Sequence, residues 1–256
     1  MMLSDDARAD APIGELPRGW CDVIGRGRMG RALSSALTMA GVPVRGPLAR
    51  GATASGASIV LLCVPDREIA AASAAVEQGA VVGHVSASAG LELLGPHERF
   101  AMHPLLSVVG SGAAFGGVTC AIDGSSEHAL DIARALATRL GMQPWRIAPA
   151  QRALYHAAAS MASNYLIALE AGAERLAREV GLEREALVPL VRATVEQWAS
   201  LGARDSLTGP IARRDEETVA RQRAAVAAAA PDMLALWDTM ALATRALVAE
   251  PRGSAA

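Results

Sequence analysis

Three polar side chains recur at every fourth position of a predicted helix, and their types suit the reduction of a carbonyl group. His156, Ser160 and Asn164 share one face of a predicted helix, since four residues make slightly more than one turn. A histidine can protonate an alkoxide near neutral pH, and an asparagine amide can orient a carbonyl. No charged residue occurs between Arg152 and Glu170. We therefore interpret this polar stripe as facing a substrate; a polar stripe satisfied inside the protein is the alternative.

A glycine-rich turn provides a second chemical signal. It lies between an apolar segment at 20–24 and a helical pattern that continues to about residue 40. Its spacing is GxGxxG, in which the glycines allow a tight turn, close approach of a pyrophosphate and close packing of helix on strand. The helix N-terminus adds free N–H groups for the phosphates. We predict a dinucleotide site, with a glycine loop that binds no ligand as the alternative. Its residues are Gly25, Arg26, Gly27, Arg28, Met29 and Gly30.

The residues after the second predicted strand, at 42–48, indicate which dinucleotide binds. NAD sites carry an acidic residue there, whereas NADP sites offer arginine to the extra phosphate. The segment from Arg45 to Arg50 contains no acid, so NADP(H) is favoured over NAD(H), with Arg50 as the phosphate ligand; Arg50 as a solvated loop residue is the alternative. We expect the nicotinamide near the residues that end two further strands. These are Val64, Pro65, Asp66 and Ser86.

Apolar segments alternate with helical patterns as far as residue 149. Strands are predicted at 20–24, 42–48, 58–64, 81–86, 100–103, 118–122 and 145–147, with helices at 67–78 and 127–140. This alternation is typical of an α/β fold with a parallel, doubly wound sheet of the Rossmann type. Residues 51–57 leave no room for a crossover helix between the second and third strands, so we expect the adenosine side of the site to be trimmed.

Helical periodicity alone follows, at 151–180, 183–200, 215–229 and 232–249. We therefore predict a Rossmann domain at residues 18–148 and an all-α substrate and dimerisation domain at 149–256, after a disordered leader at 1–17. Asp215 is the expected N-cap of the helix that begins at 216. His84 is expected in the core, and His97 and His128 at the surface.

Composition excludes several functions. The 24 basic and 26 acidic residues are mixed along the chain, so there is no electrostatic footprint for nucleic acid or an anionic membrane. Every basic residue is arginine, which excludes a lysine acid or Schiff base. The three cysteines show no metal-ligand spacing and read as reduced core thiols. No segment resembles a signal peptide or membrane span. We expect a cytoplasmic protein without a metal.

Several motifs together resemble those of a known family. They are Gly25–Gly30, Val64-Pro65-Asp66, the segments 84–88 and 103–105, Tyr155-His156 with the alanines after it, Ser163-Asn164-Tyr165 and the segment 207–213. This combination resembles bacterial Rossmann-like proteins that carry the domain of unknown function 2520, relatives of 6-phosphogluconate dehydrogenase-like, pyrroline-5-carboxylate reductase-like and F420-dependent NADP oxidoreductases. The resemblance implies a reductase-type fold and a homodimer formed through the C-terminal helices.

Two more distant resemblances concern the site. In ketopantoate reductases a lysine and two asparagines occupy the helix positions that His156, Ser160 and Asn164 take here, which implies His156 as the proton donor. The pair His103-Pro104 is similar to a motif of prephenate and arogenate dehydrogenases in which the histidine contacts substrate; a strand-end histidine is the equal alternative for His103.

A turn near the C-terminal helices supplies the remaining candidates. Thr208, Gly209, Pro210 and Arg213 are candidate ligands of a substrate carboxylate, which the arginine can bind with two hydrogen bonds. Arg214 is an equal candidate. The sequence as a whole predicts an NADPH-dependent reductase of a small carbonyl acid of the ketopantoate type. The alternatives are an imine-acid reductase of the pyrroline carboxylate type, a prephenate- or arogenate-type dehydrogenase, and a dinucleotide-binding sensor without catalysis.

Overall fold

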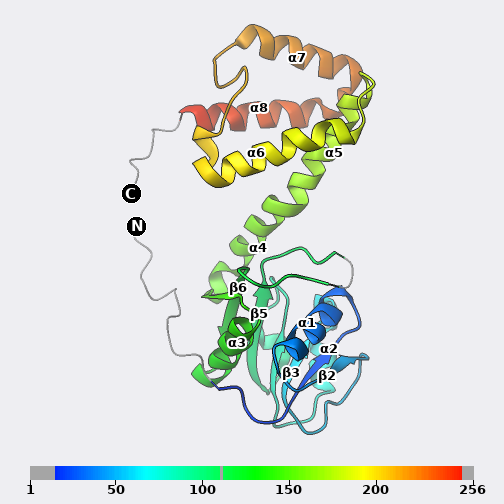
Figure 1. Ribbon diagram of the computed structural model, residues 1–256, viewed down its shortest axis with the longest axis vertical. Coiled ribbons are helices and arrows are strands. Elements are labelled where there is room, and N and C mark those ends of the chain that lie inside the picture. Colours follow the sequence, from blue (N-terminus) through cyan, green and yellow to red (C-terminus); the bar gives the residue numbers. More distant parts are fainter. Residues whose placement is uncertain (1–14, 110–111, 250–256) are drawn as a thin grey trace. The chain divides into compact units, whose positions relative to one another are not determined.

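A computed structural model describes residues 15–109 and 112–249 of the chain (Figure 1). The expected leader, residues 1–17, lies outside the described residues as far as residue 14. The chain divides into two compact units, residues 1–163 and 164–256, and each is described by itself. The predicted domain boundary near residue 149 stays a prediction.

The first unit contains a seven-stranded sheet in the order β2-β1-β3-β4-β5-β6-β7. The strands are β1 (Trp20–Ile24), β2 (Val44–Leu48), β3 (Ala57–Leu62), β4 (Val81–His84), β5 (Glu98–Pro104), β6 (Thr119–Gly124) and β7 (Gln143–Arg146). Strands β1 to β5 are parallel, which confirms the α/β fold of the Rossmann type.

The expectation of a wholly parallel sheet is wrong at one position, because β5 and β6 pair antiparallel. Parallel neighbours need a crossover connection, usually a helix. Between β5 and β6, residues 105–109 and 112–118 contain no helix, so the chain returns beside β5 in the opposite direction. Strand β7 then pairs parallel to β6, after the helix α3 (Glu127–Arg139).

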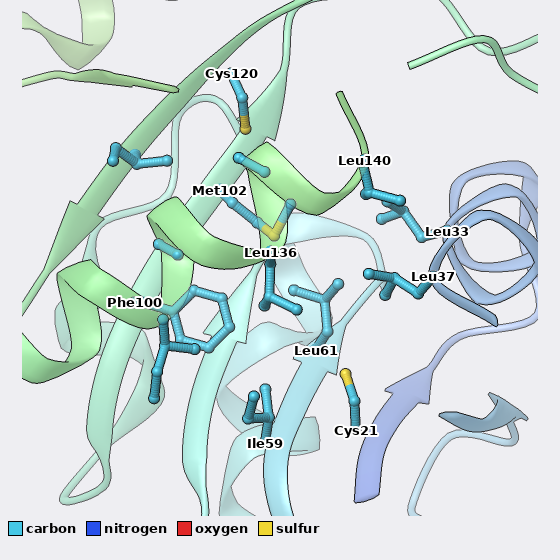
Figure 2. Packing of buried hydrophobic residues seen from close by; sticks show 14 of the residues in the cluster. Cys21, Leu33, Leu37, Ile59, Leu61, Phe100, Met102, Cys120, Leu136 and Leu140 are labelled. Atoms are coloured by element: carbon cyan, nitrogen blue, oxygen red, sulfur yellow. The ribbon is translucent and has the colours of Figure 1, made fainter. Parts of the chain in front are cut away.

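Both faces of the central strands are buried. Along β3, Ile59 and Leu61 pack in the cluster that includes residues of α1 (Arg28–Met39) and α3, as Figure 2 shows. Their neighbours Val60 and Leu62 pack in a second cluster, with α2 (Ile69–Ala74) and a 3-10 turn at Leu91–Leu94. Since alternate side chains of a strand point to opposite faces, a strand covered on both sides needs the continuous apolar sequence found here.

The three thiols belong to this interior. Cys21 and Cys120 are buried in the first cluster, Cys63 packs partly against it, and all three are free, as expected. Burial raises the pKa of each thiol, that of Cys21 to about 12. Such thiols remain protonated near neutral pH.

The connection from β2 to β3 contains no helix, as the length of 51–57 predicts. Beside it, Arg45 of β2 forms two hydrogen bonds with Asp22 of β1, at 2.6 and 2.7 Å. Arg45 also donates to the carbonyl of Ser55 at 2.9 Å. Asp22 is only 1% exposed. The Arg45 guanidinium therefore neutralises a buried carboxylate and is already engaged.

The histidines divide between core and surface, with one difference from the expectation. His84 is buried, as predicted, and His128 is exposed. His97 is only 5% exposed, so its predicted surface position is wrong. Its Nε2 lies 3.2 Å from the carbonyl oxygen of Ser73 in α2, which accounts for a polar ring in the interior.

The expected long helix at 151–180 is divided into three parts. Helix α4 (Arg152–Ser160), which belongs to the first unit, is followed by a π-helical stretch at Met161–Tyr165 and by α5 (Leu166–Arg178). A π-helix does not follow the 3.6-residue period, so the predicted faces do not continue unchanged past Ser160. Leu154 of α4 is 77% exposed in this chain.

The second unit continues with α6 (Arg184–Asp205), α7 (Glu216–Ala229) and α8 (Leu234–Ala249). The Asp215 side chain accepts a hydrogen bond from the Thr218 N–H at 3.0 Å, which confirms it as the N-cap of α7. Among the helices of the described residues, none combines the length and the apolar character that a membrane crossing requires.

Candidate functional site

The predicted cofactor residues lie at one edge of the sheet. The register pairs Ile24 with Leu62, Leu62 with His84, and His84 with Ala101. The carboxyl ends of β1, β3, β4 and β5 therefore lie side by side, and the residues that follow them meet at this edge. Open α/β sheets bind their ligands outside the carboxyl ends of the strands.

The glycine turn at the end of β1 has the geometry that a pyrophosphate site requires. A Cβ on Gly25 would lie 2.2 Å from the carbonyl oxygen of Cys63, and Gly25 has a φ of +127°. A Cβ on Gly30 would lie 1.9 Å from the carbonyl oxygen of Gly25. By contrast, a Cβ on Gly27, the N-cap of α1, would have no atom within 4 Å. The turn is thus closely packed at Gly25 and Gly30, whereas its backbone is open at Gly27. These residues fit a dinucleotide, because the pyrophosphate needs close approach to the backbone at the helix N-terminus.

The arginines around the turn differ in what already binds them. Arg26 and Arg28 are exposed, and Arg31 donates from Nε to the Arg26 carbonyl at 2.9 Å. Arg50, the predicted phosphate ligand, forms an exposed ion pair of 2.9 Å with Glu68. Exposed pairs of this kind contribute only about 0.2–1 kcal/mol, so a phosphate can replace Glu68 at little cost.

A chain of hydrogen bonds connects the ends of β3 and β4. The Ser88 hydroxyl donates to the Asp66 carboxylate at 2.6 Å. The Ser86 hydroxyl accepts from the N–H groups of Ser88 and Ala89 at 3.2 and 3.0 Å. The Ser86 N–H donates to Nδ1 of His84 at 3.2 Å, and burial lowers the pKa of His84 to about 4. The predicted residues Asp66 and Ser86 thus belong to one hydrogen-bonded network that joins the loops after β3 and β4.

At the end of β5, His103 meets Tyr155, which belongs to a family motif but is not among the predicted catalytic residues. Its Nδ1 lies 2.8 Å from the hydroxyl of Tyr155 in α4. Burial lowers the pKa of His103 to about 4 and raises that of Tyr155 to about 12. Both groups are therefore neutral near pH 7. A neutral hydroxyl beside a neutral imidazole can donate a proton and have its position fixed at the same time.

An ion pair attaches the start of α4 to the sheet. Arg152 donates to the Asp123 carboxylate at 2.8 Å and to the carbonyl of Ala89 at 3.2 Å. The side chains of Arg152 and Asp123 are only 11% and 9% exposed. Helix α4 is thus anchored three residues before Tyr155. Neither member of the pair was predicted, because no local pattern relates positions so far apart in the chain.

The other predicted catalytic residues are placed without such partners. His156 is exposed, Ser160 is half-buried, and neither makes a side-chain hydrogen bond within the described parts of the chain. Asn164 belongs to the second unit and is exposed there. The catalytic roles of His156, Ser160 and Asn164 stay predictions.

The predicted carboxylate ligands form a compact turn in the second unit. The N–H of Arg213 donates to the Gly209 carbonyl at 3.2 Å, and that of Asp215 to the Pro210 carbonyl at 2.9 Å. Thr208 and Arg213 are exposed. Arg214 has a φ of +60°, which is uncommon for a residue with a side chain. Substrate binding by Thr208, Gly209, Pro210 and Arg213 stays a prediction.

No group of three or more histidine, cysteine or acidic side chains in the described residues could hold a metal ion.

Together, the strand order and the glycine turn define an α/β protein of the Rossmann type, followed by a helical unit. Residues 118–244 match the family described as domain of unknown function DUF2520, so the chain carries a domain of this family. None of the curated proteins matches the sequence.

Three solved structures illustrate the shared fold. A protein of Thermotoga maritima is 23% identical, with a TM-score of 0.75 over 89% of this chain and 98% of that one. A candidate NADP oxidoreductase of Bacteroides fragilis is 19% identical, with a TM-score of 0.74 over the same shares. The pyrroline carboxylate reductase of Plasmodium falciparum, solved with NADP bound, is 11% identical, with a TM-score of 0.57 over 91% and 99%. At these identities the likeness concerns the fold.

Proposed function

We propose that the chain is a nicotinamide-dependent reductase that acts on a small carbonyl acid. The observation that carries this proposal is the glycine turn, in which the positions of Gly25 and Gly30 are closed by packing while Gly27 faces open space. Backbone N–H groups at the N-terminus of α1 would hold the pyrophosphate. When bound, the reduced nicotinamide supplies a hydride.

NADP(H) is the cofactor that we favour. The loop after β2 offers Arg50 and carries no acid that would bind a ribose hydroxyl. The glycine turn itself contains two further arginines, Arg26 and Arg28. Asp22, the acidic residue of β1, is buried and occupied by Arg45. The NADP bound to the Plasmodium falciparum reductase gives limited further support, because that protein shares only the fold.

For the substrate, we propose 2-oxo acids of the ketopantoate type first and cyclic imine acids second. Arg213 offers the two parallel N–H donors that suit a carboxylate, and Thr208 offers a hydroxyl next to it in the same turn. His156 is the proton donor that the sequence favours, with Asn164 orienting the carbonyl. A prephenate- or arogenate-type dehydrogenase is the third possibility.

We also propose a homodimer formed through the helices of the second unit. Helix α6 extends over 22 residues without a buried one. Its Leu190, Trp198 and Leu201 are 65%, 58% and 57% exposed. Exposed apolar surface on this scale is typical of an interface, and most such interfaces join two identical chains. Light scattering tests this: the wild type should have the mass of a dimer, and Trp198→Glu that of a monomer.

The test of the enzymatic proposal is oxidation of NADPH, followed by absorbance, with a panel of 2-oxo acids and cyclic imine acids. NADH is assayed in parallel, and binding of both cofactors is measured by fluorescence. Turnover of one substrate class with a preference for NADPH supports the proposal. Tight NADPH binding without turnover of any panel member would favour the non-catalytic sensor, and absence of binding would refute the dinucleotide site.

A further inference from the structure

Tyr155 is held in place on two sides. Three residues before it, Arg152 joins α4 to Asp123 and to the carbonyl of Ala89, at 2.8 and 3.2 Å. At its own hydroxyl, Nδ1 of His103 lies 2.8 Å away, and the two rings meet edge to face with their centroids 5.6 Å apart. A proton donor must be fixed in position to act efficiently. Among the described residues of α4, Tyr155 meets this requirement.

The engagement of the Tyr155 hydroxyl proton depends on the tautomer of His103. Besides His103 Nδ1, the nearest acceptor is the carbonyl oxygen of His103, at the long distance of 3.5 Å. His103 is neutral, so only one of its ring nitrogens carries a hydrogen. If that nitrogen is Nδ1, it donates to the tyrosine oxygen and leaves the Tyr155 O–H free for another acceptor.

The pair lies at the cofactor edge of the sheet. His84 pairs with Ala101, so His103 is level with Ser86, two residues beyond each partner. Ile24, the last residue of β1, pairs likewise with Leu62, the last residue of β3, so the glycine turn and Val64 follow neighbouring strand ends. From the turn above β1 to His103, the row crosses three strand spacings, or about 14 Å. The nicotinamide half of a bound dinucleotide extends in this direction, towards the strands beyond β1.

The inner side of the pair is closed. The cavity that His103 and Tyr155 line together with Ala87 and Ile147 measures about 10 Å³, far below the several hundred that a substrate pocket occupies. A substrate can therefore meet Tyr155 only from its exposed side, since the ring is half-buried.

We propose that Tyr155 is the catalytic proton donor of the proposed reductase and that His103 is its positioning residue. This inference rests on the proposed function. As the carbonyl carbon of a 2-oxo acid gains hydride, the C–O π bond opens and the oxygen takes the proton of Tyr155. The O–H bond of Tyr155 breaks and leaves a phenolate, which the Nδ1–H of His103 stabilises. The phenolate then regains a proton from water. The net reaction consumes one proton and one hydride and yields the 2-hydroxy acid.

His156 is the competing donor, and its surroundings differ. Its ring is exposed and has no side-chain partner within the described ranges 15–109 and 112–249. A side chain that no hydrogen bond holds in position is a poorer general acid, because the proton must be aligned with the acceptor. Single substitutions at Tyr155 and at His156 therefore decide which of the two residues donates the proton.

The first experiment compares Tyr155→Phe, His156→Ala and Tyr165→Phe with the wild type, using the substrate found with the panel. Tyr165, the only other tyrosine, is 64% exposed and serves as the matched control. We expect Tyr155→Phe to lower kcat by about 10²–10⁴-fold, with NADPH affinity retained. Tyr165→Phe should change kcat by less than about threefold on the same scale of proton-transfer effects. His156→Ala should lower kcat less than Tyr155→Phe does, whereas a larger loss in His156→Ala would assign the proton donor to His156 and overturn the inference. A Tyr155→Phe enzyme that keeps more than about a tenth of the wild-type kcat would overturn the inference.

The second experiment needs no turnover and tests the pair directly. Long-range ¹⁵N–¹H NMR of the resting protein distinguishes the two neutral tautomers of His103, assigned with a His103→Asn sample. We expect the hydrogen on Nδ1, and a shift of this signal in Tyr155→Phe. A hydrogen on Nε2 would overturn the inference, because the tyrosine proton would then be committed to His103. Wild-type protein that shows the expected tautomer but oxidises no NADPH with any substrate would refute the proposed function instead.

Discussion

Arg152 and Asp123 form an ion pair of 2.8 Å that is almost wholly shielded from solvent. The pair connects the start of α4 with β6, and a second hydrogen bond from Arg152 reaches the carbonyl of Ala89 in the loop after β4. The Arg152 guanidinium thus connects three segments of the first unit: α4, β6 and the loop after β4. The position of Tyr155 depends on this junction, because α4 continues directly from it.

Removing one charge of this pair should destabilise the first unit strongly. We expect Asp123→Asn to lower the free energy of unfolding by about 3–5 kcal/mol, because it leaves a buried guanidinium without its counter-charge. Urea denaturation followed by circular dichroism measures the change. Asp238→Asn is the control, since Asp238 and Arg223 form an ion pair of the same length at the surface, where their side chains are 44% and 50% exposed, and such pairs contribute about 0.2–1 kcal/mol. Equal losses in the two variants would contradict our account of the junction.

The glycine turn predicts opposite outcomes at two of its positions. Gly27→Ala should leave the fold stable, because its Cβ would have no neighbour within 4 Å and its φ is −71°. The same methyl group would occupy the open side of the turn and should weaken NADPH binding by about tenfold or more, or at least about 1.4 kcal/mol. Gly30→Ala should instead destabilise the protein, because its Cβ would lie 1.9 Å from the Gly25 carbonyl oxygen. Thermal unfolding and NADPH fluorescence, measured together, separate the two effects.

Cofactor preference should depend on Arg50. We expect Arg50→Ala to weaken NADPH binding by about tenfold and to leave NADH binding unchanged, since charge-assisted hydrogen bonds to a phosphate contribute about 1.5–3 kcal/mol. Arg67→Ala is the matched control, as Arg67 is 84% exposed and lies 3.9 Å from the same Glu68. Parallel titrations with NADPH and NADH give the ratio directly. Equal losses for both cofactors would remove Arg50 from the phosphate site.

Acid should destabilise the first unit through two histidines. Burial holds the pKa of His84 and His103 at about 4 in the folded chain, against an ordinary value of 6.5. Between these values the unfolded chain binds more protons, so the free energy of unfolding falls as the pH falls from 6.5 towards 4. His103→Asn should reduce this pH dependence by about one proton. Denaturation of wild type and variant at pH 7 and pH 5 measures the change, and an unaltered pH dependence in His103→Asn would contradict the low pKa of His103.

The elements of the fold follow closely from local patterns. The apolar segment 20–24 coincides with β1, and the helix predicted at 127–140 is α3 at 127–139. The glycine turn was predictable for the same reason, because its function depends on six consecutive residues. Helix α2 is shorter than the predicted helix 67–78 at both ends, because a 3-10 turn occupies Asp66–Glu68 and α2 ends at Ala74.

The contacts that assemble the site were not predictable. His103 and Tyr155 are 52 positions apart, and Arg152 and Asp123 are 29 apart. No periodicity relates such positions; their meeting depends on the path of the chain through β6, α3 and β7. The reversal of β6 depends likewise on a connection too irregular to show a pattern. The predicted polar stripe begins on α4 at His156, one position after Tyr155.

The protonated state of the three native thiols allows site-specific labelling of the chain at introduced cysteines. Because Cys21, Cys63 and Cys120 have raised pKa values, they offer almost no thiolate to a maleimide near neutral pH. A cysteine introduced on an exposed turn, once in each compact unit, would react in their place without removal of the native residues. Fluorophores attached in this way could report the distance between the two units in solution, with and without NADPH.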